Sequence, residues 1–283
     1  MELGLSLMAI RPERMPELAV RAEELGYESV FAPDHVVFPA SFDSKYPGSA
    51  DGEFPYPRDM PLYDPFVSLM QIARATTKIK LGTAIYVLAL RHPILTARLV
   101  STLDALSNGR VLLGIGAGWL KEEFTALGLD PRTRFDRFEE AVEVLRLLWT
   151  DKEVEYHGKH FDFAPVYFEP KPIAKPNPPI LFGGYSEKAL RRAVRLGDGW
   201  LSGGDAAGLE SIEALIRRVA ELREELEVTR PFQITILEGK PEPAFVEGLA
   251  KLGIERLVVM PWTRTKEAMA GMEAFAEMAR SVL

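Results

Sequence analysis

Residues 79–119 set the architecture of this chain, and they read IKLGTAIYVLALRHP (79–93), ILTARLVSTLDALS (94–107) and NGRVLLGIGAGW (108–119). Residues 79–86 are apolar and include several β-branched side chains, as is typical of a buried strand. After Pro93, apolar residues recur at helical spacing, and 111–115 is a second continuous apolar run. Two such strands joined by a helix predict a βαβ unit in a parallel sheet that is covered on both faces.

Small residues stand at the ends of both predicted strands. Gly82, Thr83 and Ala84 lie near the end of the first, and residues 114–118 read GIGAG at the second. Small side chains at the carboxyl ends of parallel strands leave room for a flat group close to the backbone. The GxGxG pattern resembles part of a nucleotide-binding fingerprint, but it is equally consistent with tight packing of strand against loop.

The same alternation of strand and helix runs through the whole chain. Strands are expected at 3–8, 27–32, 79–86, 111–115, 179–182, 199–202, 232–237 and 257–260. Eight parallel units with right-handed crossovers close most naturally into a (β/α)8 barrel. The alternative is an open doubly wound sheet, but the Gly-rich dinucleotide fingerprint is missing after the first strand. We therefore predict an α/β fold with a single TIM-barrel domain over residues 1–283.

Two insertions interrupt the alternation. Residues 36–62 contain seven Pro or Gly residues and several aromatic residues, which is typical of a functional loop or lid. Residues 151–178 form a second non-helical insertion. Within it, VEYHGKHFDF (154–163) predicts a hairpin that turns at His157 and Gly158.

The composition excludes several classes of function. The net charge of the 283 residues is −7, with no basic cluster, which argues against a general nucleic-acid-binding surface. Without cysteine, the chain has no disulfide, thiol nucleophile or thiolate metal site. The N-terminal residues do not resemble a signal peptide, and no apolar run approaches the ~18 residues of a membrane span. We expect a cytoplasmic protein that binds neither nucleic acid nor membrane.

Asp34 and His35 are candidate catalytic residues, because barrel active sites lie at the carboxyl ends of the strands. The two residues follow Pro33 at the end of the second predicted strand. A histidine there can donate a proton or form a hydrogen bond with a planar cofactor. The alternative is that Asp34 caps a turn and His35 fills space. For Arg91, after the third strand, we favour an ion pair at the start of the next helix over anion binding.

Residues 183–186, after the fifth strand, predict an anion site. Gly183, Gly184, Tyr185 and Ser186 precede the expected helix 187–196. Backbone amides at a helix N-terminus, the positive end of the helix dipole and a serine hydroxyl together attract a phosphate. Ser186 can also simply cap the helix, and the two roles are compatible.

Other chemistries have little support. The four histidines, His35, His92, His157 and His160, lack the HExxH pattern, and no GxSxG element occurs, so we expect neither a metal site nor a serine hydrolase. Carboxylates alternate with arginines along helical segments such as 217–227, which indicates a solvated face. A phosphosugar aldolase or isomerase is disfavoured because Lys80 stands at the start of a strand, the wrong end of the barrel for a Schiff base.

The motifs in combination resemble the luciferase-like monooxygenase superfamily, in particular its F420-dependent oxidoreductase branch. The resemblance spans essentially the whole chain, and its most specific segments are FAPDHV (31–36), LGTAIYVLALRHP (81–93), TLDALSNGRVLLGIGAGWLKEEF (102–124) and KPIAKPNPPILFGGYSEKALRRAVRLGDGW (171–200). It implies a (β/α)8 barrel in which residues 36–62 form a lid.

The resemblance also implies roles for individual residues near the cofactor ring. Enzymes of the F420 branch have a non-proline cis peptide bond in a bulge of the third strand, against which the deazaflavin ring packs. The matching bond joins Ala84 and Ile85, with Val87 just beyond it. Gly116 and Ala117 match positions that line the ring and its tail.

Further matches concern the phosphate and the substrate. Residues 183–186 match the cofactor-phosphate loop of the family. Asp34 and His35 match a pair near the redox centre, where the histidine is proposed to assist proton transfer. Trp119 stands where sugar-phosphate dehydrogenases of the family carry a catalytic glutamate. Oxidation of glucose 6-phosphate is therefore not expected, and Trp119 together with the aromatic lid indicates a substrate pocket for a bulkier, less charged compound.

The function that the resemblance implies is hydride transfer between F420 and an organic substrate. A monooxygenase that uses reduced FMN and O₂ is the alternative, since both cofactors carry a phosphate and a three-ring system. A non-catalytic flavin-binding protein on the same barrel is a third possibility. The implied partners are a small organic substrate, a flavin or F420 reductase that supplies reduced cofactor, and a second copy of the chain in a homodimer.

Overall fold

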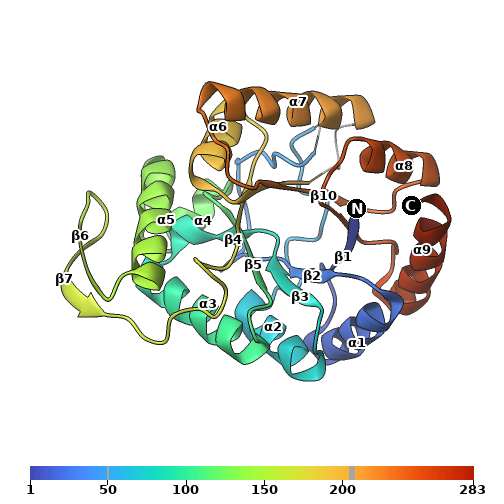
Figure 1. Ribbon diagram of the computed structural model, residues 1–283, viewed down its shortest axis with the longest axis horizontal. Coiled ribbons are helices and arrows are strands. Elements are labelled where there is room, and N and C mark those ends of the chain that lie inside the picture. The colour runs from blue at the N-terminus through green and yellow to red at the C-terminus, as the bar shows by residue number, and fades with distance from the viewer. Residues whose placement is uncertain (50, 204–207) are drawn as a thin grey trace.

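Eight parallel strands close a barrel in the computed structural model, which describes residues 1–49, 51–203 and 208–283 (Figure 1). The barrel strands are β1 (Glu2–Ser6), β2 (Ser29–Ala32), β3 (Lys80–Thr83), β5 (Val111–Gly116), β8 (Ile180–Gly183), β9 (Gly199–Gly203), β10 (Gln233–Glu238) and β11 (Arg256–Val259). They pair in this order, and β1 also pairs with β11, which closes the ring. The predicted (β/α)8 barrel is confirmed, and the open sheet is excluded.

The helices surround the barrel as an outer ring (Figure 1). They are α1 (Met15–Leu25), α2 (Pro65–Ala75), α3 (Pro93–Ser107), α4 (Lys121–Ala126), α5 (Arg134–Thr150), α6 (Glu187–Leu196), α7 (Leu209–Glu225), α8 (Pro243–Lys251) and α9 (Ala268–Val282). Short 3₁₀ turns occur at Pro12–Arg14, Leu88–Leu90, Pro131–Thr133 and Thr265–Glu267. Polar residues set the helix ends: Asp64 caps α2 by accepting a hydrogen bond from the Val67 N–H, and Asn108 ends α3 in the left-handed conformation.

A second, smaller apolar core fills the barrel interior with the buried side chains of Phe31, Leu112, Leu181, Leu201 and Val258. Glycine makes room for the largest of them, because a Cβ atom at Gly82 would lie 2.3 Å from the Phe31 ring. A Cβ atom at Gly114 would lie 1.9 Å from the carbonyl oxygen of Thr83 on β3. These two glycines therefore serve close packing inside the barrel, rather than the approach of a ligand.

The third strand is divided, which differs from the continuous strand predicted at 79–86. The peptide bond between Ala84 and Ile85 is cis, as the resemblance predicts. The chain resumes pairing in β4 (Tyr86–Val87), which lies beside the end of β5. Residues 84–85 thus form a bulge at the carboxyl end of the barrel.

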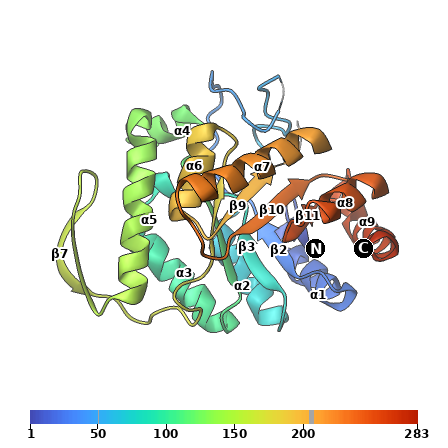
Figure 2. The ribbon, with the colours of Figure 1, turned by 45° about the horizontal axis from the view of Figure 1, so that its top comes forward.

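The second insertion contains the predicted hairpin, but the turn comes later than expected. Its strands are β6 (Glu153–His157) and β7 (Asp162–Tyr167), and His157 pairs with Asp162. The Gly158 N–H donates to the carbonyl oxygen of Phe161 (2.9 Å), so the turn spans 158–161. The hairpin lies beside α5, on the side away from the barrel (Figures 1 and 2).

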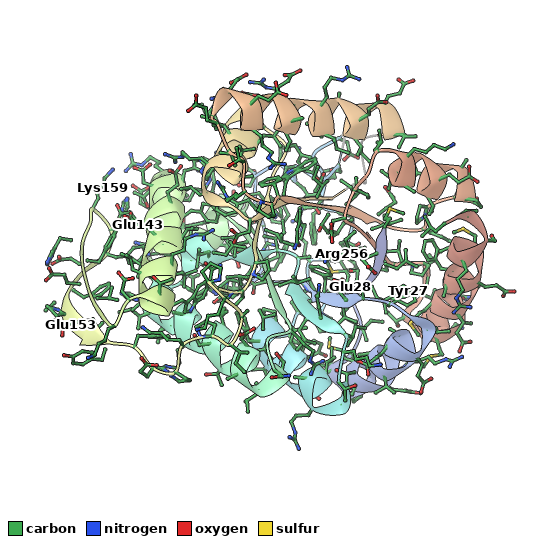
Figure 3. The ribbon with its side chains drawn as sticks, in the orientation of Figure 1. Tyr27, Glu28, Glu143, Glu153, Lys159 and Arg256 are labelled. Carbon is green, nitrogen blue, oxygen red and sulfur yellow. The ribbon has the colours of Figure 1, made fainter. Side chains whose placement is uncertain are left out.

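A buried ion pair holds the amino end of the barrel together (Figure 3). Arg256 on β11 is fully buried and donates to both carboxylate oxygens of Glu28, at 2.7 and 2.8 Å. Lys80, at the start of β3, lies 2.6 Å from the same carboxylate. Burial by itself would raise the pKa of Glu28, but the hydrogen bonds and charge of Arg256, aided by Lys80, lower it to about 2.

Candidate active site

The centre of the candidate site is Ile85, in the bulge after β3. A Cβ atom at Gly183 would lie 2.1 Å from Ile85 Cδ1, and one at Gly116 would lie 3.1 Å from Ile85 Cγ2. The Ile85 side chain therefore rests against two glycines, at the ends of β5 and β8. We call Ile85, Gly116 and Gly183 the floor of the site. Ala84 and Ala117, next to the floor in the chain, are half-buried and have small side chains.

The loop after β8 has the features of an anion site. Gly184 has φ of 118°, a conformation that favours glycine, and its carbonyl oxygen accepts a hydrogen bond from Trp200 Nε1 (2.8 Å). Ser186 caps α6 by accepting from the Ala189 N–H (3.2 Å). The first-turn amides of a helix have no acceptor within the helix, and the positive end of its dipole lies there. Tyr185 is half-buried between these residues.

Asp34 lies in a buried ion pair with Arg91. Its Oδ1 is 2.7 Å from Arg91 Nη2, and its Oδ2 is 2.5 Å from Arg91 Nη1 and accepts the Val87 N–H at 2.9 Å. Burial raises the pKa of Asp34, an effect that Arg91 and Val87 oppose. The ion pair expected for Arg91 is present, with Asp34 as its partner. Both oxygens of Asp34 are occupied, so the side chain braces the β2 loop against β4. The catalytic role expected for Asp34 stays a prediction.

His35 is held by a carboxylate that the sequence analysis missed. The Nδ1 atom of His35 lies 2.9 Å from Oε2 of Glu123, whose side chain is only 1% exposed. Oε1 of Glu123 accepts the N–H groups of Val36 (2.6 Å) and Val37 (3.2 Å). No other polar contact of His35 side-chain nitrogens exists among the residues that the structure describes, so Nε2 has no protein partner there.

Periodicity does not single out Glu123, because it lies on α4, a six-residue helix too short to show an apolar face. The useful signal is topological. Glu123 follows the GIGAG segment of β5 in the chain, and His35 follows β2. Loops after both strands meet at the carboxyl end of the barrel, so a carboxylate from one can reach a histidine from the other.

The lid, residues 36–62, packs its aromatic side chains around Trp119. Ring centroids of Phe42, Tyr46 and Phe54 lie 5.6, 5.2 and 5.9 Å from that of Trp119. The His35 ring lies 6.0 Å from the same indole. The blue loops that stand beyond α4 and α6 in Figure 2 belong to this segment. Trp119 therefore lies among the aromatic rings of the lid, stacked on Phe54 and in edge-to-face contact with Phe42 and Tyr46.

Glu122, next to Glu123 on α4, also holds the lid. Its Oε1 accepts the N–H groups of Asp43 (2.9 Å) and Ser44 (3.2 Å). The Lys121 N–H donates to Ser44 Oγ (3.1 Å). Two adjacent carboxylates of α4 therefore fix the lid at two places, one at its root and one further along.

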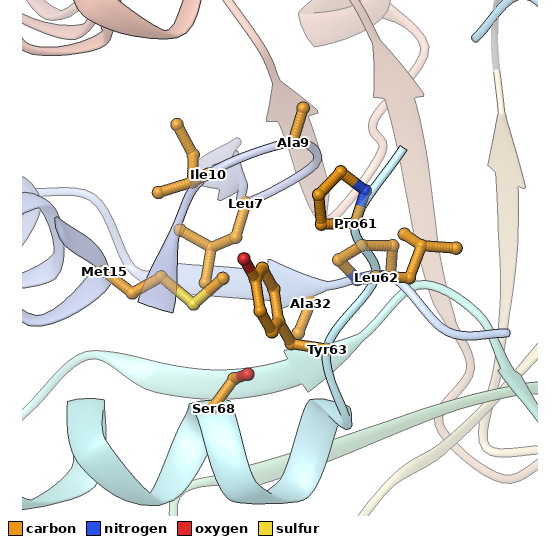
Figure 4. Close-up of a pocket in the computed structure, with 10 residues that line it drawn as sticks. Leu7, Ala9, Ile10, Met15, Ala32, Pro61, Leu62, Tyr63 and Ser68 are labelled. Carbon is orange, nitrogen blue, oxygen red and sulfur yellow. The ribbon is translucent and has the colours of Figure 1, made fainter. Parts of the chain in front are cut away.

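A small cavity lies beside the site, between the ends of β1 and β2 and the residues that precede α2 (Figure 4). Its volume of about 10 Å³ is room for one water molecule. Apolar side chains form most of its wall, with Tyr63 and Ser68 as the polar ones. It is too small for a cofactor ring and is separate from the floor.

Residues 1–49, 51–203 and 208–283 contain no group of three or more His, Asp or Glu side chains placed to hold a metal ion. Within the same ranges, every helix is too short or too polar to cross a membrane.

The closed barrel defines a TIM-barrel protein, and the half-buried floor and the loop 183–186 form a candidate ligand site at the carboxyl ends of its strands. The sequence profile of the family described as luciferase-like monooxygenase matches residues 2–237. The chain belongs to this family. Its members are oxidoreductases and monooxygenases, and they include F420-dependent and FMN-dependent enzymes.

Individual relatives show the range of the family. An uncharacterized protein of Mycobacterium tuberculosis is 33% identical over 281 residues, 98% of each chain. The F420-dependent glucose-6-phosphate dehydrogenase of Nakamurella multipartita is 30% identical over 86% of this chain and 72% of its own. The FMNH₂-dependent dimethylsulfone monooxygenase of Pseudomonas putida is 32% identical over 46% of this chain and 36% of its own. Monooxygenase RslO1 from Streptomyces bottropensis shares the fold, with a TM-score of 0.82, 19% identity and 99% coverage of both chains.

Proposed function

We propose that the protein is an F420-dependent oxidoreductase that transfers a hydride between the cofactor and an uncharged organic substrate. The observation that carries this proposal is the arrangement at the barrel mouth. A floor of Ile85 between two glycines, an anion loop and a histidine with a free ring nitrogen lie on loops that meet there. Similarity to the F420-dependent glucose-6-phosphate dehydrogenase of Nakamurella multipartita, which extends over most of both chains, favours F420 over FMN.

The residues present fit such a cofactor. The glycine floor leaves Ile85 as the surface on which one face of a planar ring can rest, with Val87 and Ala117 beside it. The loop of residues 183–186 and the first turn of α6 would hold the phosphate. The reduced or oxidised deazaflavin supplies the hydride chemistry when it is bound.

The remaining residues bind the substrate and handle the proton. Nε2 of His35 would give or take the proton that accompanies hydride transfer. Trp119 and the aromatic lid would bind the substrate and exclude water. Arg91 and Lys45 are paired with Asp34 and Glu53, so neither offers an unpaired charge to a phosphorylated substrate. The aromatic rings around Trp119 support an uncharged one.

The second candidate is a monooxygenase that uses reduced FMN and O₂. Similarity to the dimethylsulfone monooxygenase of Pseudomonas putida favours it, although this similarity covers less than half of the chain. The floor and the anion loop suit either cofactor, because both have a planar three-ring system and a phosphate.

The test is a side-by-side titration of the purified apoprotein with F420 and FMN, each oxidised and reduced, followed by fluorescence. Tight binding of F420 with weak binding of FMN is the expected result. Preference for reduced FMN would support the monooxygenase, and a substrate screen would then include O₂. If neither binds, the cofactor assignment is wrong and a non-catalytic role becomes the better proposal.

We further propose that the protein acts in the cytoplasm as a homodimer and receives reduced cofactor from a separate F420 or flavin reductase. Sedimentation of the purified protein at micromolar concentration tests the dimer directly. A single species at the mass of one chain, 31.6 kDa, would contradict it.

A further inference from the structure

We propose that Glu123 is a positioning residue that fixes the tautomer of His35 and joins it to the seating of the lid. This inference rests on the proposed function at one point only, the proton transfer assigned to Nε2 of His35. The observation behind it is the buried carboxylate of Glu123, of which one oxygen contacts the His35 ring and the other the first two amides of the lid.

Oxygen Oε2 of Glu123 determines which nitrogen of His35 carries the proton. A carboxylate can only accept hydrogen bonds, so His35 Nδ1, 2.9 Å away, must be the donor. In the neutral ring Nε2 is then without a proton. It is therefore a proton acceptor in the neutral ring and a proton donor after protonation. Without this carboxylate, nothing in the described surroundings of Nδ1 selects one tautomer.

Oxygen Oε1 of the same carboxylate holds the root of the lid. It accepts the Val36 and Val37 N–H groups, the first two amides of the lid. These amides follow His35 directly in the chain, so a lid displaced at its root would also displace His35 from Oε2. Seating the lid and orienting the ring therefore depend on the same side chain.

The surroundings of the ring leave Glu123 as its only polar partner among the described residues. Phe38, Phe54 and Trp119 have ring centroids 4.8, 6.4 and 6.0 Å from that of His35. The neighbouring charged residues in the described part of the site, Asp34 and Arg91, are paired with each other. These aromatic walls cannot replace the hydrogen bond that Glu123 provides.

The experiment is the Glu123→Gln variant, examined by ¹⁵N NMR of the histidine rings without any cofactor. The side-chain carbonyl of the introduced amide must still face the two lid amides, because these are donors. Its NH₂ group then faces Nδ1 and forces that nitrogen to accept. At a pH at which imidazole rings are neutral, we expect the ring proton of His35 on Nδ1 in the wild type and on Nε2 in Glu123→Gln. Resonances are assigned by their absence in His35→Ala.

The matched control is Glu122→Gln, one residue away on α4. Its side chain also holds two lid amides but does not contact His35, so the proton is expected to remain on Nδ1. A wild-type ring protonated on Nε2, or an unchanged tautomer in Glu123→Gln, would overturn the proposal. If Glu123→Gln does not fold, the tautomer of His35 in the wild-type spectrum is by itself the test of the proposal.

A kinetic measurement separates this inference from the proposed function. With a substrate and cofactor identified by the titration and screen, kcat of Glu123→Gln should fall roughly tenfold or more, while the affinity for cofactor stays near that of the wild type. The tautomer of His35 is measured in the apoprotein, so its result does not depend on which cofactor the protein uses. If the tautomer is inverted but kcat is unchanged, Glu123 does position His35, but His35 takes no part in catalysis.

Discussion

At the scale of single residues, the two ring nitrogens of His35 have different surroundings. Nδ1 is bound to Glu123, and Nε2 has no protein partner among the described residues. Replacing His35 by Ala should therefore lower kcat by roughly 10²–10⁴-fold, the usual contribution of a general acid or base, with little change in cofactor affinity.

Steady-state kinetics and cofactor titration of the purified variant measure these two effects. The control is His157→Ala, which removes an exposed histidine of the β6–β7 hairpin, far along the chain from the site. Equal turnover of His35→Ala and wild type would show that His35 has only a structural role.

Gly183 is the residue at which the floor can be altered by one methyl group. The Cβ atom of Gly183→Ala would lie 2.1 Å from Ile85 Cδ1, so the end of the Ile85 side chain must move. We expect it to rotate toward the ring site and to weaken cofactor binding about tenfold, or about 1.4 kcal/mol. Fluorescence titration measures the loss.

The Ile85→Val change removes the clashing Cδ1 atom and provides a matched test. The double variant Gly183→Ala/Ile85→Val should recover most of the lost affinity, because the space for the new methyl group is restored. If the double variant binds as weakly as Gly183→Ala, the loss has a cause other than this contact.

At the scale of elements, helix α4 acts as the anchor of the lid. Glu122 accepts two amides of residues 43–44, and hydrogen bonds to a charged acceptor contribute about 1.5–3 kcal/mol each when well formed. Glu122→Ala should release this part of the lid and raise amide hydrogen exchange of residues 43–44 roughly tenfold or more. Hydrogen-exchange mass spectrometry of peptides from 36–62 measures the change.

The control for the lid is Glu53→Ala. Glu53 pairs with Lys45 on the exposed side of the same segment, and such surface pairs contribute only about 0–1 kcal/mol. Its exchange pattern should stay close to that of the wild type. Equal protection of residues 43–44 in Glu122→Ala and wild type would mean that the aromatic packing around Trp119 alone holds the lid.

At the scale of the whole molecule, the ion pair of Glu28 and Arg256 makes stability depend on pH. Burial opposes ionisation of Glu28, but Arg256 and Lys80 lower its pKa from 4.5 to about 2. The ionised carboxylate therefore stabilises the fold at pH values above 4.5, and this contribution is lost as the pH falls from 4.5 toward 2. The shift corresponds to roughly 3 kcal/mol.

Glu28→Gln should lower the free energy of unfolding at pH 7 by about 3–5 kcal/mol, because it leaves Arg256 buried without a charged partner. It should also reduce the difference between pH 7 and pH 3. Urea unfolding at the two pH values measures both, with Glu13→Gln as the control at an exposed site. If Glu28→Gln lost as much stability between pH 7 and pH 3 as the wild type, other carboxylates would be the cause of the acid sensitivity.

The sequence predicted most of the barrel strands to within a few residues, because each is a short apolar run bounded by a loop. Residues 111–115 became β5 with one residue added, and the predicted helix 187–196 is α6. The eight-fold alternation and right-handed crossovers then left a closed barrel as the best solution. Local patterns could not predict α4, whose six residues are too short to show helical periodicity.

What the sequence alone determined is the barrel, the end of it that carries the site, and the identity of several residues that lie there. Only the tertiary structure decided what those residues contact, because their partners come from distant parts of the chain. Asp34 became a brace once Arg91, 57 residues away, reached both of its oxygens. Glu123 gained its role from contact with His35, 88 residues earlier. The period of apolar residues shows which face of one helix or strand is buried. A contact between side chains of two loops depends instead on how the closed barrel places those loops next to each other.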